Sequence, residues 1–375
     1  MRILFYCQHV LGIGHFFRSM EIAGALDRHE ILFVGGGESL VGFTTPPHVR
    51  MLCLPALMMD PDFKAMHSSG GALEEVRGER VRILLDAFSS FGPDVVLTEL
   101  FPFGRRQFKF ELMPLLKLAR EGRQYARVVC SLRDILVEKD KPGYEQEVVD
   151  LLNQYYDLLL VHSDPEVASL DETFSLTGHI RIPVEYTGFV ARPSADLKGP
   201  PGQGKTIVAS SGGGRVGSDL LAAVILAMPK IRRQDITLKV FAGPFMEGDD
   251  RARLENLAKE DPRIKVLPFS LDFPSELARA DLSISMAGYN TCMDILSAGV
   301  PAIVYPFPRN REQGMRAKKL KDLGLLRVID SPDPDRLASE IKSVMGSHYL
   351  RRVAPVNLSG AANTARLIEN LLGAE

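Results

Sequence analysis

The chain has 375 residues, carries 45 Lys and Arg against 47 Asp and Glu for a formal net charge of −2, and contains no Trp. Single hydrophobic cores stop growing at about 250 to 300 residues, so this length predicts two domains. The balanced charge argues against non-specific nucleic-acid binding, which depends on clustered Lys and Arg. The four Cys are widely spaced and form no C-x-x-C pair, which predicts free thiols and neither a zinc site nor disulfides.

The N-terminus, MRILFYCQHV, predicts a β-strand and not a signal peptide, because no small-residue cleavage site follows its apolar run. No apolar stretch approaches the ~20 residues that a membrane span needs. We therefore expect a cytoplasmic protein.

In the first half, apolar runs of strand length alternate with segments of helical period, such as 15–26 and 73–89. This alternation is typical of a mostly parallel sheet with helices on its faces. The strands expected in this half are 2–7, 30–34, 49–54, 94–98, 127–131 and 157–161.

The alternation stops at ARPSADLKGPPGQG, residues 191–204, a Pro- and Gly-rich stretch that predicts a linker. It then restarts with a strand, a glycine turn and a helix at 218–228. The strands expected here are 206–210, 236–241, 264–267, 281–285, 302–305 and 327–329. We therefore expect an α/β protein with two Rossmann-like domains that face each other across a cleft. The expected parts are residues 1–191, a linker at 192–204, residues 205–357 and a C-terminal helix within 358–375.

Two glycine-rich strings in the middle of the chain differ in their context. Gly199 to Thr206, GPPGQGKT, matches the phosphate-loop pattern, but a strand follows the string where the mechanism needs a helix. Gly212-x-Gly214-x-x-Gly217 does lie between a strand and a helix, which favours a phosphate turn. The next strand ends in KVFAGP without the acidic residue of a dinucleotide site, so a diphosphate site is favoured.

Two D-x-D strings suggest a metal site only weakly. Asp333 stands before Pro334 and predicts a helix N-cap, whereas Asp60 to Asp62 lies in an irregular, Met-rich stretch.

The richest segment runs from residue 281 to 323. Its first strand leads to the small-residue turn Ala287-Gly288 and a helix that carries Asp294, and its second leads to Arg309, Arg311, Glu312 and Gln313. Free N–H groups and the helix dipole at such a turn suit an anion. Because strand ends share one edge of a parallel sheet, both loops should contribute to one polar cluster.

On these residues the chain resembles GT-B glycosyltransferases of the MurG-like family, with a glycosyltransferase family 28 type C-terminal domain. The resemblance covers LGIGHFFRSMEIAGAL, YTGFV, SSGGGRVGSD, MAGYNTCMDILSAGVPAIVYPF and REQGMRA. It implies a C-terminal helix that crosses back to the first domain. Asp294 stands where many relatives have Glu, and the loop before Glu312 is rich in Arg.

The resemblance implies a diphosphate between two turns, the ribose on Asp294, the sugar on Glu312 and Gln313, and the base beside Phe269 and Ser270. The residues expected to bind the nucleotide sugar are Gly14, Ser211, Gly212, Gly213, Gly214, Arg215, Phe269, Ser270, Ala287, Gly288, Asn290, Thr291, Asp294, Glu312 and Gln313.

His15 is the candidate general base. It follows a glycine turn and opens a helix, whose N-terminus disfavours the imidazolium and keeps the ring able to accept a proton. Glu99, which ends a strand, is the candidate group that orients it. His9 and His162 also end strands, and we expect both to be structural.

On this resemblance we expect an inverting, metal-independent transferase that moves a hexosyl or N-acetylhexosaminyl group from a UDP-sugar to a hydroxyl, without a further cofactor. Arg105, Arg106 and Lys109 beside apolar residues suggest either a solvated basic face or a lipid-linked or anionic acceptor at the inner face of a membrane. Two alternatives stay open: a nucleotide-sugar epimerase or hydrolase on this fold, and a non-catalytic nucleotide-sugar-binding subunit.

Overall fold

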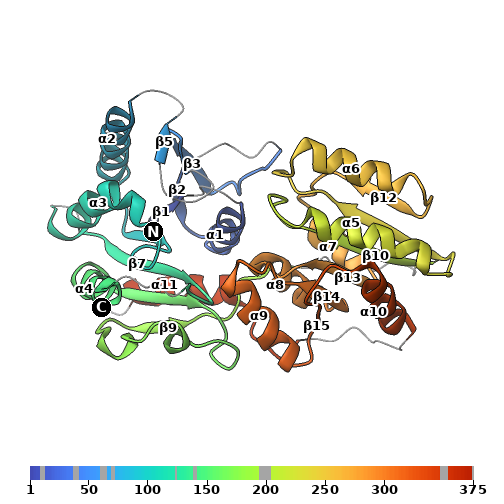
Figure 1. Cartoon of the computed structure of the whole chain (residues 1–375). Helices are drawn as coiled ribbons and strands as arrows, with labels where there is room; N and C mark the ends of the chain where they lie inside the picture. The colour runs from blue at the N-terminus through green and yellow to red at the C-terminus, as the bar shows by residue number, and fades with distance from the viewer. Residues whose placement is uncertain are drawn as a thin grey trace. The chain divides into compact units, whose positions relative to one another are not determined.

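The computed structural model describes residues 1–8, 13–36, 42–59, 66–68, 72–122, 125–137, 142–193, 204–346 and 354–373 (Figure 1). The chain divides into two compact units. Unit 1 comprises Met1–Val190 and Val356–Glu375, and unit 2 comprises Ala191–Pro355. Each unit has a parallel sheet and a hydrophobic core of its own.

Within the described residues, unit 1 contains a seven-stranded parallel sheet in the order β3-β2-β1-β6-β7-β8-β9. Its central strands are buried along almost their whole length and are mostly apolar, because helices cover both faces. The strands are β1 (Arg2–Gln8), β2 (Glu30–Gly36), β3 (Val49–Leu54), β6 (Val95–Glu99), β7 (Arg127–Arg133), β8 (Leu158–His162) and β9 (Val184–Tyr186). A separate antiparallel hairpin pairs β4 (Leu57–Met59) with β5 (Met66–Ser68).

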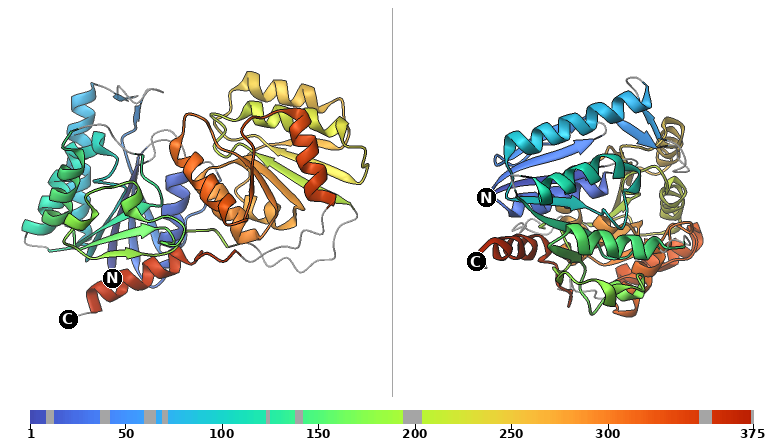
Figure 2. Two further views of the ribbon diagram at one scale, coloured as in Figure 1. Left: turned by 60° about the horizontal axis from the view of Figure 1, so that its bottom comes forward. Right: turned by 90° about the vertical axis from the view of Figure 1, so that its left-hand side faces the viewer.

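The helices of unit 1 form two groups. Helix α1 packs against α11, and α2 packs against α3 (Figure 2). The last helix joins unit 1 through a bridge between Val190 and Ser359 and a 2.9 Å contact between His29 Nε2 and Glu369 Oε1. The helices are α1 (Gly14–Ala25), α2 (Leu73–Phe91), α3 (Lys109–Glu121), α4 (Tyr144–Tyr155) and α11 (Gly360–Gly373), with the short turns η1 (Arg106–Phe108), η2 (Leu170–Glu172) and η3 (Thr177–His179).

Among its described residues, unit 2 contains a six-stranded parallel sheet in the order β12-β11-β10-β13-β14-β15. Its strands are β10 (Lys205–Ser210), β11 (Ile236–Phe241), β12 (Ile264–Leu267), β13 (Leu282–Met286), β14 (Ala302–Tyr305) and β15 (Arg327–Val328). Its helices are α5 (Ser218–Ala227), η4 (Met228–Lys230), α6 (Gly248–Ala258), α7 (Phe273–Arg279), α8 (Tyr289–Ala298), α9 (Arg311–Asp322) and α10 (Pro334–Gly346). Helix α5 packs against α6 and α10, and α7 packs against α8.

Both sheets reverse their order of connection at one point. In unit 1 the chain builds outward from β1 to β3 and then returns to place β6 on the other side of β1. In unit 2 the same reversal places β13 beside β10. Loops that leave such neighbouring strands in opposite directions open a crevice at the carboxyl edge, where ligands of α/β sheets bind. A ligand site is therefore expected at the carboxyl ends of β1 and β6 and of β10 and β13.

The strands predicted from the sequence are present, with ends shifted by one or two residues. Strand β9 and the β4–β5 hairpin were not predicted, because three-residue strands give too short an alternation to recognise. The predicted cap at Asp333 is confirmed: its Oδ1 accepts a 2.8 Å hydrogen bond from Arg336 N.

The predicted linker at 191–204 and the phosphate-loop string at 199–206 lie mainly outside the described residues. His9 and Asp60 to Asp62 also lie outside them. Of the phosphate-loop string, Lys205 and Thr206 are described and begin strand β10. The Lys205 ammonium donates to Asp281 Oδ1 at 2.8 Å, so this lysine serves an ion pair at the start of the sheet.

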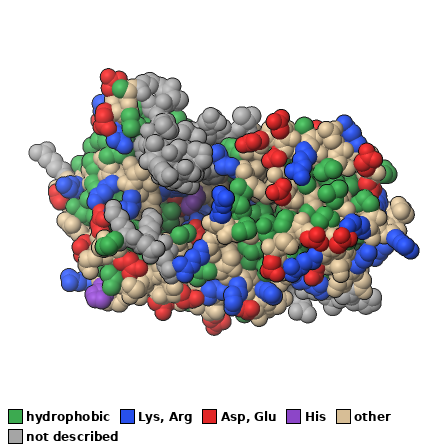
Figure 3. All heavy atoms as spheres, viewed as in Figure 1, with side chains coloured by type: hydrophobic (Ala, Val, Ile, Leu, Met, Phe, Trp, Pro, Cys, Tyr) green, Lys and Arg blue, Asp and Glu red, His purple; other side chains and the backbone are tan. Residues whose placement is uncertain are grey.

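Charged side chains of both signs are interspersed over the face of the molecule drawn in Figure 3, in line with the net charge of −2. Among the helices that the structure describes, none is both long enough and apolar enough to pass through a lipid bilayer.

A buried ion pair anchors the helical layer of unit 1. Arg80 on α2 and Glu111 on α3 have fully buried side chains, and Arg80 donates to both carboxylate oxygens at 2.8 and 2.6 Å. Gln8 Oε1 accepts a further 3.0 Å hydrogen bond from Arg80, and the Tyr6 hydroxyl donates to Glu111. This network ties α2 and α3 to the carboxyl end of β1.

Replacing Glu111 with Ala leaves the Arg80 guanidinium buried without its counter-charge. We expect the change to lower the free energy of unfolding of unit 1 by about 3–5 kcal/mol, measured by urea unfolding followed by circular dichroism. The matched control is Asp86→Ala, which removes the exposed pair between Arg82 and Asp86 and should cost about 1 kcal/mol or less. Equal losses in the two variants would contradict this assignment.

Candidate functional site

His15 and Glu99 meet at the point where the order of the unit 1 sheet reverses. His15 lies in the first turn of α1, after β1, and Glu99 is the last residue of β6, the neighbour of β1. His15 Nδ1 lies 2.6 Å from Glu99 Oε1, and the side chains are 21% and 0% exposed. The imidazole therefore reaches solvent while its partner carboxylate is buried.

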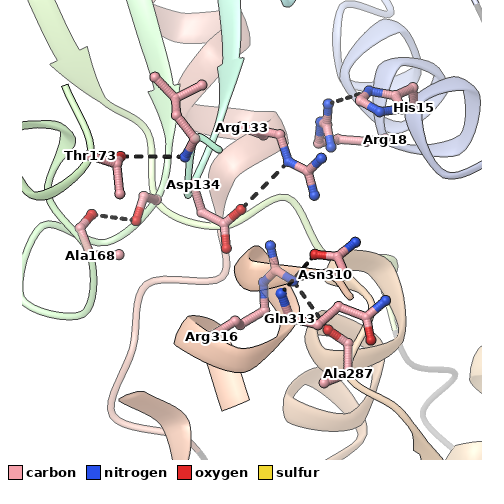
Figure 4. A network of polar contacts seen from close by, with 12 residues as sticks. His15, Arg18, Arg133, Asp134, Ala168, Thr173, Ala287, Asn310, Gln313 and Arg316 are labelled. Atoms are coloured by element: carbon pink, nitrogen blue, oxygen red, sulfur yellow. Dashed lines mark hydrogen bonds and ion pairs between the residues drawn. The ribbon is translucent and has the colours of Figure 1, made fainter. Parts of the chain in front are cut away.

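Two arginines complete this charge cluster. Arg18 Nη2 donates to the same Glu99 Oε1 at 2.6 Å, and Arg105 Nε lies 3.8 Å from Glu99 Oε2. Arg18 Nη2 is also 3.2 Å from His15 Nδ1, as Figure 4 shows. A nitrogen that donates to Glu99 has no lone pair to accept from Arg18, and the shorter contact favours Nδ1–H facing the carboxylate. Nε2 is then the ring nitrogen that can accept a proton.

The cluster sets the charge of both partners. Burial raises the pKa of the Glu99 carboxyl, but His15, Arg18 and Arg105 together reverse this and hold the pKa below its ordinary value. Burial lowers the pKa of His15, Glu99 opposes this, and Arg105 and Arg18 reinforce it, so that the pKa lies well below the ordinary value. Near neutral pH the pair is therefore a neutral imidazole held by an ionised carboxylate.

The loop after β6 delivers Arg105 to Glu99 through unusual backbone angles. Leu100 has φ +67° and Arg105 has φ +56°, both in the left-handed region that non-glycine residues seldom adopt. Hydrogen bonds from Leu100 N to Ser131 O and from Gly104 N to Leu100 O hold the loop in this form. Strained non-glycine residues concentrate at functional sites, and here the strain positions a guanidinium.

In unit 2 the first glycine turn follows β10. Gly212 and Gly214 have φ values of +69° and +84°, and Gly217, the N-cap residue of α5, has φ +98°. Ser210 Oγ accepts a 3.0 Å hydrogen bond from Gly212 N. Ser211 Oγ is buried and has no hydrogen-bond partner among the described residues. The turn thus presents a hydroxyl group and backbone N–H groups beside a helix N-terminus, which suits an anion.

A second loop supports this turn from behind. A Cβ atom on Gly243, after β11, would lie 2.3 Å from Gly214 N, so the two backbones can touch only because both residues are glycine. Phe245 N donates to Gly213 O at 3.0 Å, and the Phe245 ring lies 5.8 Å from the exposed guanidinium of Arg215. The conformation of the turn is therefore fixed without any ligand.

The second small-residue turn follows β13, the neighbour of β10. Gly288 is the N-cap residue of α8 and makes no side-chain cap hydrogen bond to the first N–H groups of the helix. Thr291 Oγ1 lies between the turns: Cβ atoms built on Gly212 and Gly288 would be 3.7 and 3.9 Å from it. The glycine turn and the N-terminus of α8 thus face one small volume at the reversal point of the sheet.

The loop after β14 supports α8 and the second turn. Arg316 on α9 is buried and donates from Nη1 to Ala287 O at 3.1 Å, a hydrogen bond drawn in Figure 4. Its guanidinium also lies over the Tyr289 ring at 5.5 Å. Gln313 Oε1 accepts from Phe307 N at 3.0 Å. Gln313 therefore shapes its own loop in addition to any contact with a ligand.

Of the residues predicted to hold a nucleotide sugar, the structure brings the Ser211 to Arg215 turn together with Gly288 and Thr291. Gly14 opens α1 in unit 1. Asn290 lies in the first turn of α8 and Glu312 in that of α9.

The remaining predicted residues, which the resemblance assigns to base and ribose, are less simply placed. Phe269 and Ser270 are half-buried in the loop after β12. The carboxylate of Asp294 is buried on α8 and is paired with Arg192.

The structure also shows the surroundings of His162, Arg106 and Lys109. His162 is fully buried between Ser131 Oγ at 2.7 Å and Thr187 Oγ1 at 2.9 Å, as a structural histidine should be. Arg106 and Lys109 both pair with Glu147. No group of three or more His, Cys, Asp or Glu within the described ranges is arranged to hold a metal ion.

The sequence does not point to Arg18, Arg192 and Arg316, and it suggests Arg105 only as part of a basic face or an acceptor site, not as a partner of Glu99. Arg18 stands three residues after His15 on one helix, a spacing that puts two side chains on one face. The others are brought in by a loop, a linker and a second helix, for which the sequence gives no local signal.

Residues 211–359 match the family model described as glycosyltransferase family 28 C-terminal domain. Similar curated proteins bear the name UDP-N-acetylglucosamine--N-acetylmuramyl-(pentapeptide) pyrophosphoryl-undecaprenol N-acetylglucosamine transferase. The one from Nitrobacter hamburgensis is 31% identical over 177 residues, which is 45% of this chain and 44% of that protein. The one from Methylobacterium radiotolerans is 28% identical over 166 residues, 43% and 42% of the two chains. The matches thus span less than half of the length of these relatives.

Solved structures resemble the whole chain in fold at low sequence identity. The calicheamicin glycosyltransferase CalG4 has a TM-score of 0.64 and 17% identity, with 100% of this chain and 98% of that chain covered. MurG of Acinetobacter baumannii has a TM-score of 0.57 and 15% identity, with 100% and 99% covered. A putative UDP-N-acetylglucosamine 2-epimerase of Listeria monocytogenes has a TM-score of 0.67 and 14% identity, with 100% and 96% covered.

Both sheets are parallel, both reverse at one pair of strands, and the family match falls on the unit with the two glycine turns. The chain therefore has the two-domain α/β fold of GT-B glycosyltransferases, and its residues 211–359 match the C-terminal domain of glycosyltransferase family 28.

Proposed function

We propose that the protein is an inverting, metal-independent glycosyltransferase that moves an N-acetylhexosaminyl group from a UDP-sugar to an acceptor hydroxyl. The observation that carries this proposal is the pair of glycine turns after β10 and β13, which lie inside the segment matched by the transferase domain. The names of the curated relatives support UDP-N-acetylglucosamine as donor and a lipid-linked acceptor. We infer from them a cytoplasmic place of action at the inner face of a membrane.

In this proposal unit 2 binds the donor. The N–H groups of the Ser211 to Arg215 turn and of the start of α8 would donate to the diphosphate oxygens, with Ser211 Oγ as a further donor. These donors are fixed before the ligand arrives, because Gly243 supports the turn. Preorganised donors stabilise charge as it develops, here on the leaving diphosphate, and need no metal ion to do so.

Unit 1 would supply the base. His15 Nε2 takes the proton from the acceptor hydroxyl, whose oxygen attacks the anomeric carbon while the bond from that carbon to the diphosphate oxygen breaks. Attack from the face opposite to the leaving group inverts the anomeric configuration. Glu99 accepts from Nδ1–H, and so holds the tautomer and stabilises the imidazolium that forms.

The epimerase alternative rests on fold likeness alone, at 14% identity to the Listeria monocytogenes protein. The transferase proposal has the family match and the curated relatives in addition.

The role of His15 is tested by replacement with Ala. General bases contribute typically ~10²- to 10⁴-fold to rate, so kcat for transfer from UDP-N-acetylglucosamine to N-acetylmuramyl-(pentapeptide) pyrophosphoryl-undecaprenol should fall by that range. The dissociation constant of UDP should stay within about twofold, because donor binding is assigned to unit 2. The matched control, His179→Ala, changes an exposed histidine of η3 and should keep full activity. Transfer by the His15 variant within tenfold of the native rate would refute the base assignment.

The electrostatic setting of His15 predicts the sign of a pKa change. Arg105 lowers the pKa of His15, so Arg105→Met should raise it and let the imidazolium form at higher pH than in the native protein. NMR titration of the His15 ring, assigned with the Ala variant, measures the shift. Arg106→Met is the control, because Arg106 pairs with Glu147 and should leave the titration of His15 in place. An unchanged or lowered pKa in the Arg105 variant would contradict this arrangement.

The proposed diphosphate turn is tested at Gly243, which packs against the turn and is not itself assigned to the ligand. Gly243→Ala puts a methyl group about 2.3 Å from Gly214 N, which forces the turn to move and should weaken UDP binding at least about tenfold, as one or two lost hydrogen bonds would. Isothermal titration calorimetry gives the constants. In the control Gly248→Ala the new Cβ meets no atom within 4 Å, and UDP affinity should hold. Native affinity in the Gly243 variant would place the diphosphate elsewhere.

A further inference from the structure

His162 is a buried imidazole that the proposed mechanism does not use. It is the last residue of β8, and its side chain is fully buried. Burial lowers its pKa to about 3, to which Arg18 adds and which Glu99 opposes. Two charges of the candidate site thus act on this ring. Near neutral pH the ring is neutral, with one nitrogen that donates a hydrogen bond and one that accepts.

The hydrogen bonds around His162 run in one direction. Thr187 Oγ1 has a single proton, and the carbonyl oxygens of Gly188 at 2.8 Å and Val161 at 3.4 Å lie within its reach. Whichever carbonyl takes that proton, Oγ1 accepts at 2.9 Å from Nδ1–H of His162. Nε2 then carries the lone pair and accepts at 2.7 Å from the hydroxyl group of Ser131. The chain of donors thus runs from Ser131 through His162 to Thr187.

At its first end this chain of hydrogen bonds reaches the site. Ser131 pairs with Glu99 in the register of β6 and β7, so the two side chains lie on one face of the sheet. The carbonyl oxygen of Ser131 also accepts a 2.9 Å hydrogen bond from Leu100 N, where the left-handed loop to Arg105 begins. The position of Ser131 therefore affects both the carboxylate and the loop that brings the guanidinium to it.

At its other end the chain of hydrogen bonds reaches the C-terminal part of unit 1. Thr187 O accepts a 2.8 Å hydrogen bond from Asn363 Nδ2 of α11. Phe189 N donates to Asn357 O at 2.7 Å, and Gly360 N donates to Phe189 O at 3.0 Å. The edge of the sheet beside the proposed base is thus connected to the segment that leads into the last helix.

We propose that His162 is a positioning residue: through Ser131 it fixes the carboxylate of Glu99, on which the proposed base depends. It acts through these residues and not on the substrate. Without the imidazole, the hydroxyl groups of Ser131 and Thr187, both fully buried, lose this partner and must turn or shift toward another. The inference rests on the proposed function, because it concerns the same pair of base and carboxylate.

Replacing His162 with Leu tests the inference, because Leu has a similar size and lacks both ring nitrogens. The kcat for transfer should fall roughly tenfold to a hundredfold, as expected when a catalytic group is misplaced by about 1 Å. The dissociation constant of UDP should stay within about twofold, because donor binding is assigned to unit 2. The NMR signals of the His15 ring, assigned with the Ala variant, should move, because the carboxylate that faces the ring has moved.

Two further variants separate positioning from a general loss of stability. In His162→Gln the amide carbonyl can accept from Ser131 and the amide N–H group can donate to Thr187, so kcat and the ring signals should return toward native values. The matched control is His48→Leu, which removes a 2.9 Å hydrogen bond between His48 Nε2 and Ala23 O in unit 1. It should leave kcat and the ring signals unchanged.

The inference requires both changes in the Leu variant of His162. A slower reaction with unmoved ring signals overturns it, as do moved signals with native kcat, or a Gln variant as impaired as the Leu variant. If the Leu variant does not fold, Ser131→Ala removes the same hydrogen bond with the loss of one atom, and native kcat in that variant overturns the inference. If the native protein transfers no sugar, the proposed function fails, and the ring signals alone then test the positioning role.

Discussion

Parallel strands bring all their carboxyl ends to one edge of a sheet, and a reversal in strand order opens that edge between two neighbouring strands. In unit 1 the reversal falls between β1 and β6, and the pair there is His15 and Glu99. In unit 2 it falls between β10 and β13, where the glycine turn after β10 and the Ala287-Gly288 turn after β13 lie. The same topology thus positions, in one unit, a ring nitrogen that can accept a proton and, in the other, N–H groups that can donate hydrogen bonds to an anion.

Buried carboxylates at these sheet edges are paired with arginine side chains of opposite charge. Glu99 is compensated by Arg18 and Arg105, and Asp294 by Arg192, where burial raises the pKa of Asp294 and the guanidinium opposes it. With these partners Glu99 stays ionised, because its pKa is held below the ordinary value, and both carboxylates are fixed in direction. This explains how His15 can stay neutral and oriented, and why Asp294 is bound to the protein itself.

The sequence carries enough information for the fold, because long apolar runs and helical periods repeat through both halves. It also locates Glu99 and both glycine turns, which stand directly after predicted strands, and His15, which follows the glycine turn after the first strand. It does not reveal that Arg105 lies beside Glu99, because this contact depends on left-handed backbone angles at Leu100 and at Arg105 itself. Nor does it reveal the partner of Asp294, because a contact over 102 positions leaves no local pattern. Local signals thus place the loops, and only tertiary contacts decide which charges meet.

We propose that a nucleotide diphosphate binds where the two turns of unit 2 meet. A crystal structure of the protein with UDP tests this most directly. We expect diphosphate oxygens within hydrogen-bond distance of the N–H groups of Gly212 to Gly214 and of the first turn of α8 after Gly288. A diphosphate bound away from both turns would contradict it.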